Sequence, residues 1–187
     1  MANFKTLQID QFLINLAAKQ PTPGGGTAAA IGASIGSAAA AMAAEYTQRK
    51  KDKESGAAEI ATKLITSLDV TPLLQAADDD ATAYSDLQRT WKDNNMSSEE
   101  KATIEARALS IPTELLEMCH ERIHQIHNFL PHCNSNITSD AKVGIHQLAG
   151  AARAAYQTVL VNSPDEEEKM RLMTLLKDIR DVEDGIL

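Results

Sequence analysis

The chain has 187 residues and a formal net charge of −8, and one domain spanning residues 1–187 accounts for this length. The acidic balance argues against a nucleic-acid-binding protein, which normally presents a basic face. Aromatic residues make up only 4% of the sequence, which favours close-packed helices over a β-sandwich. Two cysteines give no disulfide framework, and the N-terminus shows no secretory signal, so we expect a cytoplasmic protein.

The hydrophobic pattern predicts an all-α bundle of about six helices and no strand. The segments cover about residues 7–19, 27–51, 55–91, 97–129 and 138–162, and a sixth opens at residues 163–166. Ser97 and Glu100 form a capping-box pattern, and Pro164 suits the first position of the last helix. We expect a bend at Thr71-Pro72 and a kink or restart at Pro112, because proline removes a helical hydrogen bond.

Residues 21–27 read Pro-Thr-Pro-Gly-Gly-Gly-Thr and are the most informative segment of the chain. The prolines stiffen the backbone, and the glycines let another group come close to it. Thr27 is a candidate N-cap of the next helix, whose free N–H groups favour an anion or an electron-rich atom. The segment has neither the lysine of a P-loop nor the preceding strand of a dinucleotide-binding turn. A plain tight connection between two helices is the alternative.

The helix after this segment has one nearly bare face, because small residues recur every four positions at Gly32, Gly36, Ala40 and Ala44. Such a face lets two helices approach closely. The uncharged run over residues 21–44 is long enough to suggest a transmembrane segment. We reject that interpretation because its apolar residues are mostly alanine. We expect instead a central helix of a soluble bundle, or a helix at a subunit interface.

Several motifs, in order, resemble the cyclodeaminase/cyclohydrolase family of folate one-carbon metabolism. This family includes the C-terminal domain of formiminotransferase-cyclodeaminase and free-standing methenyltetrahydrofolate cyclohydrolases. The resemblance covers nearly the whole chain and rests on the segment 21–29, on 42–47 with the basic cluster 49–51, on Asp80-Ala81-Thr82-Ala83-Tyr84, on Ala108 with Pro112, on Asn134 with Ser139-Asp140, and on 155–162. Two departures are Thr158, where the family often has Asn, and Arg49, where a small residue is common.

The resemblance implies an all-α homodimer that acts on a tetrahydrofolate derivative and needs no metal or redox cofactor. The family's cyclodeaminase reaction closes 5-formiminotetrahydrofolate to 5,10-methenyltetrahydrofolate and releases ammonia. Its cyclohydrolase reaction opens the methenyl compound with water to 10-formyltetrahydrofolate. Both reactions pass through a tetrahedral carbon between N5 and N10, and the sequence does not decide between them. A non-catalytic helical oligomer, or a folate-binding module with the same fold, is the alternative.

Given this resemblance, Asp80 is the candidate general acid/base. Burial in a folate pocket raises the pKa of a carboxyl group, so that it exchanges protons nearer to neutral pH. Asp80 ends the run Asp78-Asp79-Asp80, and we expect two of the three side chains to face solvent. A solvated acidic helix face is the alternative for this run.

The candidate substrate-binding residues are Pro23, Gly24, Gly25, Gly26, Thr27, Arg49, Lys50, Asn134, Ser139 and Asp140. The glycine amides could meet a folate carbonyl, the glutamate tail, or charge at the reacting carbon. Asp140 could accept from the N–H edge of the pterin or stabilise a helix N-terminus. Asn134 could bind folate or its own loop. The basic cluster 49–51 could attract the tail carboxylates or complement a helix C-terminus.

Three histidines share one helix face, since His120, His124 and His127 are spaced by four and three residues. With His132 and Cys133 nearby, they suggest a zinc site. We nevertheless expect no bound metal. Acidic and amide side chains interleave with the histidines, no H-E-x-x-H motif is present, and the family that the chain resembles needs none.

Overall fold

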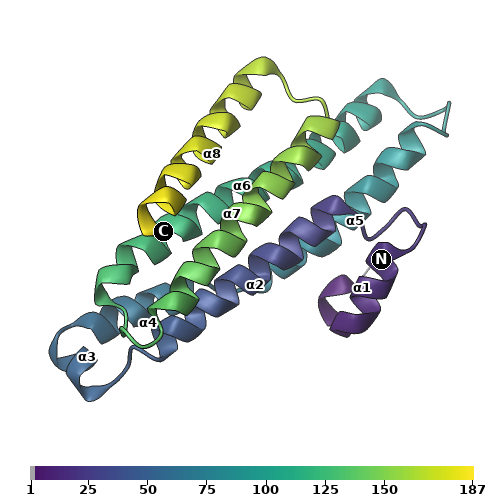
Figure 1. Cartoon of the computed structure of the whole chain (residues 1–187). Helices are drawn as coiled ribbons and strands as arrows, with labels where there is room; N and C mark the ends of the chain where they lie inside the picture. Colours follow the sequence, from purple (N-terminus) through teal and green to yellow (C-terminus); the bar gives the residue numbers. More distant parts are fainter. Residues whose placement is uncertain (1–2) are drawn as a thin grey trace.

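A computed structural model describes residues 3–187, which form helices and no strand (Figure 1). The prediction of an all-α bundle is therefore confirmed. Four long helices form the bundle: α2 (Gly25–Glu45), α5 (Thr71–Thr90), α6 (Ser98–Phe129) and α7 (Thr138–Val161). Helix α8 (Glu166–Ile186) packs on α6 and α7. The shorter elements are α1 (Ile9–Ala17), α3 (Lys50–Glu54), α4 (Ala57–Ser67), and the 3₁₀ turns η1 (Phe4–Thr6) and η2 (Leu130–His132).

The core lies where the inner faces of the long helices meet. Alanines of α2, such as Ala33 and Ala40, are fully buried, as are the larger Leu116 and Ile123 of α6 and Leu148 of α7. By length and composition α2 is apolar enough to cross a membrane, but 56% of its most apolar window is buried inside the bundle. A core helix of a bundle explains this composition without a membrane.

The small-residue face of α2 packs against α7 of the same chain. A Cβ atom on Gly36 would lie 2.9 Å from the Gly144 carbonyl oxygen, and one on Gly144 would lie 2.8 Å from the Ala40 Cβ. Gly32 has more room, because the nearest atom to its added Cβ is the Ala151 Cβ at 4.0 Å. The predicted close helix contact is confirmed, and its partner is α7 rather than a second subunit.

Helix boundaries differ from the sequence prediction in two places. The second predicted helix ends at Glu45 instead of Lys51, and Lys50–Glu54 forms the separate α3. The helix predicted over residues 55–91 is two helices, α4 and α5, because the chain breaks after Ser67 and restarts at Thr71. Pro72 lies in the first turn of α5, where proline is favoured. The expected bend is therefore a true helix end.

Helix α6 runs through Pro112 without a break, so the predicted restart at this residue does not occur. Packing along its 32 residues outweighs the roughly 3 kcal/mol that an interior proline costs. Its predicted cap is confirmed, since Ser97 Oγ accepts from the Glu100 N–H at 3.1 Å. The last helix is capped instead by Asp165, whose carboxylate accepts from the Glu168 N–H at 2.8 Å.

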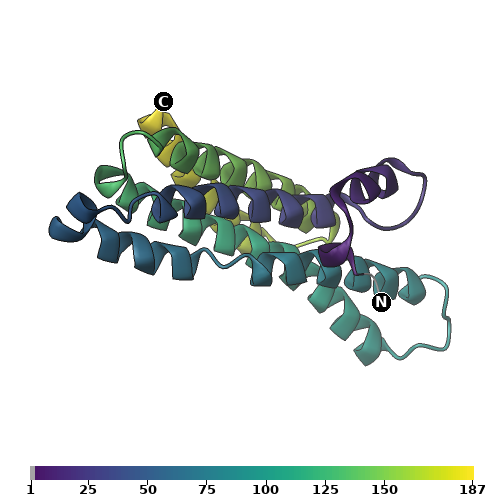
Figure 2. The same cartoon turned by 90° about the horizontal axis from the view of Figure 1, so that it is seen from below.

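The N-terminal segment is fixed to the end of the bundle at which α5 and α6 are connected (Figure 2). The Phe4 N–H donates to Asp78 Oδ1 at 2.6 Å, and the Phe4 ring packs edge-on against Phe12 of α1. Phe12 is buried, whereas Ile9 and Leu13 on the same helix are exposed. The segment thus folds over the middle of α5, next to the candidate site.

Candidate functional site

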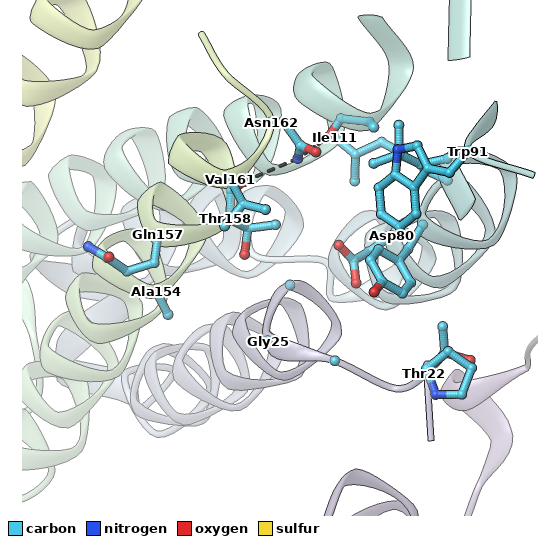
Figure 3. A pocket seen from close by; sticks show the side chains of 17 residues that line it. Thr22, Gly25, Asp80, Trp91, Ile111, Ala154, Gln157, Thr158, Val161 and Asn162 are labelled. Carbon is cyan, nitrogen blue, oxygen red and sulfur yellow. Dashed lines mark hydrogen bonds between the residues drawn. The ribbon is translucent and has the colours of Figure 1, made fainter. Parts of the chain in front are cut away.

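A cavity of about 590 Å³ opens at the end of the bundle where α2 begins (Figure 3). The segment before α2 forms one side, and α5, α6 and α7 form the others. The lining residues are Pro21, Thr22, Gly24, Gly25, Gly26, Asp80, Ala83, Tyr84, Leu87, Trp91, Ala108, Ile111, Ala154, Gln157, Thr158, Val161 and Asn162.

Asp80 enters this cavity from α5 and lies against the first turn of α2. Thr27 Oγ1 donates a hydrogen bond to Asp80 Oδ2 at 2.8 Å. Gly24 is the N-cap of α2, so Thr27 is not, and its hydroxyl group is directed to Asp80. The sequence prediction of an N-cap at Thr27 is therefore wrong. Thr27 instead holds the candidate catalytic carboxyl group.

Gly26 makes the approach of Asp80 to α2 sterically feasible. A Cβ atom on Gly26 would lie 2.6 Å from Asp80 Cγ, closer than real side-chain contacts allow. Gly24 and Gly25 have no atom within 4 Å of an added Cβ. Of the three consecutive glycines, Gly26 is therefore the one that the position of Asp80 requires.

The environment of Asp80 suits a proton carrier. Burial raises the pKa of its carboxyl group above the ordinary value, while hydrogen bonds from the Thr27 side chain and backbone act in the opposite direction. No basic side chain within residues 3–187 forms an ion pair with it. A carboxyl group in such surroundings accepts and releases a proton more readily near neutral pH than an exposed aspartate does.

The other two aspartates of the run have different partners. Asp78 is buried beneath the N-terminal segment and accepts the Phe4 N–H, with Lys5 Nζ 3.8 Å from its carboxylate. Asp79 is partly exposed and lies 3.6 Å from Arg107. We expected two of the three to face solvent, and this is wrong for Asp78, because the chain folds back over it.

The cavity walls are mostly apolar, with a few polar groups on α7. Tyr84 and Trp91 pack edge-to-face with ring centroids 6.4 Å apart, and both rings are partly exposed. Asn162 ties the end of α7 to α6, since its Nδ2 donates to the Ala108 carbonyl at 2.8 Å and to the Thr158 carbonyl at 3.1 Å. Such a cavity can enclose a flat, partly aromatic ligand and present few polar groups to it.

The remaining predicted residues form a second group at the opposite end of α2. Arg49 Nη1 donates to Asn134 Oδ1 at 2.6 Å, and Arg49 Nε lies 2.7 Å from Oδ2 of the buried Asp52. Ser139 Oγ donates to Asp140 Oδ2 at 3.3 Å near the start of α7. Helix α2 has 21 residues, so the two groups lie about 30 Å apart along it.

The structure thus divides the sequence candidates. Gly24, Gly25, Gly26 and Asp80 line the cavity, while Thr27 and Pro23 are buried next to it. The structure does not bring Arg49, Lys50, Asn134, Ser139 or Asp140 to this cavity within one chain. Lys50 extends into solvent, with Glu54 3.9 Å away.

Sequence reasoning missed the α7 wall and the aromatic pair as parts of the site. Thr158 and Asn162 entered only as motif residues, although their spacing of four places them on one helix face. Trp91 follows Tyr84 by seven residues and so shares its helix face. No sequence motif indicated that this face contacts a ligand.

A family model described as formiminotransferase-cyclodeaminase matches residues 8–181. The chain belongs to this family. A methenyltetrahydrofolate cyclohydrolase of Methylorubrum extorquens is 28% identical over 179 residues, which cover 91% of this chain and 86% of that protein. The crystal structure of a formiminotetrahydrofolate cyclodeaminase from Thermotoga maritima has the same fold, with a TM-score of 0.82 at 20% identity, over 97% of this chain and 92% of that one.

Membership of the formiminotransferase-cyclodeaminase family confirms the resemblance seen in the sequence. The matched region contains the whole cavity and also the second group around Arg49 and Asn134. The cavity around Asp80 therefore belongs to a family of folate one-carbon enzymes.

Proposed function

We propose that the protein is an enzyme of tetrahydrofolate one-carbon interconversion that hydrolyses 5,10-methenyltetrahydrofolate to 10-formyltetrahydrofolate. The observation that carries this proposal is the convergence of Asp80 and the glycine segment on one cavity. A bundle that serves only as a scaffold does not need a buried carboxyl group at the rim of an open cavity. The cyclohydrolase relative supports hydrolysis as the first reaction to test.

The size and walls of the cavity support a folate ligand. Its volume of about 590 Å³ lies within the roughly 300–1,000 Å³ typical of small-molecule sites. The exposed edges of Tyr84 and Trp91 offer aromatic surface to the pterin or aminobenzoyl ring. We propose that the ring system lies between these side chains and the α7 wall, with the reacting carbon near Asp80.

Asp80 is proposed to move the proton in the hydrolysis. Water attacks the methenyl carbon, and the Asp80 carboxylate accepts a proton from this water, which gives a tetrahedral carbon between N5 and N10. The bond from this carbon to N5 then breaks as N5 takes the proton back from Asp80. The hydroxyl group on the carbon loses its proton to solvent and becomes the carbonyl of the formyl group, which the product carries on N10. A negative carboxylate beside the cationic methenyl group also stabilises the bound substrate.

The first turn of α2 contributes to binding in this proposal. Its N–H groups lie at the positive end of the helix dipole, and Gly25 and Gly26 of this turn line the cavity. They suit a carbonyl oxygen of the ligand, or the oxygen that gains charge in the tetrahedral intermediate. The lining residues include one carboxyl group and no histidine or cysteine, too few ligands for a metal centre at the reacting carbon. We therefore propose that the reaction uses no metal cofactor.

We also propose that the protein is a homodimer. Exposed apolar residues follow one face of α2 and α7, including Ile35, Met42, Tyr46, Val143 and Val161. Helices α2 and α7 pack side by side (Figure 1), and each of these five residues is at least 40% exposed. Val161 also lines the cavity, so a partner on this face would border the site.

An antiparallel dimer would join the two groups of predicted residues. In each chain, Asp140 and the cavity lie at opposite ends of the bundle. A two-fold axis across the middle of α2 would place the Asp140 end of one chain beside the cavity of its partner. Arg49, Asn134 and Asp140 would then reach a folate ligand without belonging to the cavity of their own chain.

The second candidate reaction is the cyclodeaminase reaction, because the Thermotoga maritima protein with the same fold is a formiminotetrahydrofolate cyclodeaminase. In that case N10 attacks the formimino carbon and gives up its proton, and the former imino nitrogen is protonated and leaves as ammonia. Asp80 occupies the same position in either reaction. A folate-binding module without turnover is the alternative from another class.

Parallel absorbance assays test the proposal. Purified protein is incubated with 5,10-methenyltetrahydrofolate, and separately with 5-formiminotetrahydrofolate, and the methenyl chromophore is followed. Its loss above the uncatalysed rate supports the cyclohydrolase reaction, and its appearance from the formimino compound assigns the cyclodeaminase reaction instead. If neither occurs while the protein binds the folate by calorimetry, the enzymatic proposal is wrong and the binding module stands. The Asp79→Asn variant is the matched control for Asp80→Asn.

A further inference from the structure

Three potential metal ligands converge on the side of the bundle where α8 packs on α6. His120 Nε2 and His124 Nε2 each lie 2.7 Å from the same oxygen, Asp178 Oδ2, and 3.2 Å from each other. The two histidines are one helical turn apart on α6, and Asp178 comes from α8. From the sequence alone we expected no metal on this histidine face. The sequence could not show the third ligand, because Asp178 is 58 residues from His120.

The triangle of ligand atoms has nearly the dimensions of a tetrahedral zinc site. With zinc about 2.0–2.1 Å from each ligand atom, these atoms are about 3.3 Å from one another. The two imidazole nitrogens are already at this distance, and the carboxylate oxygen needs to move out by about 0.6 Å. Asp178 has the freedom to move, because its side chain is 47% exposed.

We propose that His120, His124 and Asp178 bind a divalent first-row transition-metal ion such as zinc, with water as the fourth ligand. Two imidazoles and one carboxylate are ligands that zinc, copper and nickel ions accept, whereas magnesium and calcium ions prefer oxygen alone. The histidine side chains are 23% and 35% exposed, so an ion reaches them from solvent.

A second histidine–carboxylate pair between α7 and α8 differs from this group and serves as a comparison. His146 Nδ1 lies 3.0 Å from Glu183, but Glu183 also pairs with Arg153. The Arg153 guanidinium group repels a metal ion, and its ion pair with Glu183 occupies the carboxylate that would otherwise bind the metal. Among the described residues, Asp178 has only the two histidines as ion-pair partners. The first group thus offers a metal three ligands, and the second offers one free imidazole.

The proposed ion would fasten α8 to the bundle. Helix α6 lines the folate cavity at Ala108 and Ile111, and His120 lies nine residues beyond Ile111, about 13 Å along the helix. None of the residues lining the cavity belongs to α8. We therefore expect metal binding to change the stability of the fold, with no part in the reaction at Asp80.

Zinc titration by calorimetry and thermal unfolding tests this site on untagged protein that has been treated with a chelator. We expect one equivalent of zinc to bind and to raise the melting temperature, with no effect of magnesium. Asp178→Asn and His124→Asn should each weaken zinc binding by at least about tenfold, since even the outer partners of metal ligands contribute about 10–100-fold. His146→Asn should leave it unchanged. Cobalt should give the visible bands of a four-coordinate ion in the wild type only.

Because Asp178 is half exposed, its asparagine variant should fold, and circular dichroism verifies this. Two results would overturn the proposal. One is an absence of saturable zinc binding to the wild type. The other is binding that the Asp178 and His124 variants retain at full strength, which would place the ion elsewhere on the chain.

Discussion

Gly26 and Asp80 share one small space at the start of α2. The missing side chain of Gly26 leaves room for the Asp80 carboxyl group, whose Cγ atom would be 2.6 Å from a Cβ at this position. Thr27, one residue later, donates its hydroxyl hydrogen bond to the same carboxyl group. Two adjacent residues of the glycine segment therefore fix the position of Asp80.

Replacing Gly26 by alanine should displace Asp80 and reduce turnover by about 10²-fold, the effect of a misplacement of about 1 Å at a catalytic group. The added methyl group has no other way to fit unless the carboxyl group moves. Steady-state kinetics of the purified variant measures the effect. Gly185→Ala, at an exposed position with no atom within 4 Å, is the control. Normal turnover in Gly26→Ala would mean that the exact position of Asp80 is unimportant.

Replacing Asp80 by asparagine should reduce turnover by about 10²–10⁴-fold, the usual contribution of general acid–base catalysis. Folate affinity should change much less, because an amide oxygen still accepts the Thr27 hydrogen bond. Asp79→Asn should keep its activity, since this change affects only surface contacts with Arg107 and Gln75. Near-normal turnover in Asp80→Asn would remove Asp80 from the chemistry.

The same variant should be more stable than the wild type at neutral pH. The pKa of Asp80 is higher in the folded than in the unfolded chain, because burial disfavours the charged carboxylate. The folded state therefore holds the proton more tightly, and wild-type stability falls as the pH rises through the folded-state pKa. The advantage of Asp80→Asn should vanish below the ordinary pKa of aspartate. Urea unfolding of both proteins across this pH range measures the difference, and an advantage that is equal at all pH values would contradict the raised pKa.

Local sequence patterns predicted most of the fold. The period of apolar residues identified the long helices, and the small-residue stripe of α2 indicated a close contact. The break between α4 and α5 has a local cause, because the Thr71 N–H donates to Asp69 Oδ1 at 3.1 Å and Pro72 suits the first turn of α5. The unbroken passage of α6 through Pro112 depends instead on packing between distant helices. No local pattern contains that information.

The sequence predicted the site only where residues that are adjacent in the sequence belong to it. Gly26 and Thr27 belong to one segment, and its composition indicated a backbone that another group approaches. The group that approaches this backbone is the Asp80 side chain, because α5 crosses the start of α2. The sequence indicated Asp80 only through the resemblance to the family. The position of Asp178 between two histidines required the path of α8, which no motif describes.

The close contact between α2 and α7 predicts opposite effects of two glycine substitutions. Gly36→Ala should lower the free energy of unfolding by about 1–3 kcal/mol, because its methyl group overlaps the Gly144 backbone. Gly32→Ala should raise it by about 0.5–1 kcal/mol, since alanine favours a helix and the site has room. Gly36→Leu should be worse than Gly36→Ala. Urea unfolding measures all three, and a stable Gly36→Leu protein would show that the helices can separate without cost.

The exposed face of α2 and α7 predicts a dimer that a single charge can dissociate. Ile35→Asp, at a residue that is 57% exposed, should give a folded monomer in sedimentation, because an unpaired carboxylate cannot be buried between two apolar faces. Ile9→Asp is the matched control, as Ile9 is 80% exposed on α1, away from this face. A wild-type protein that sediments as a monomer would contradict the proposed dimer.

If the site is completed by the partner, two inactive variants should restore each other. Asp80→Asn damages the cavity, and Asp140→Asn damages the second group at the far end of α2. In an antiparallel heterodimer of the two, one site combines the intact Asp80 of one chain with the intact Asp140 of the other. Mixing the variants under conditions that exchange subunits should therefore recover activity that neither has alone. Loss of activity in both variants without recovery on mixing would place Asp140 outside the partner's site, and its contact with Ser139 would then be structural only.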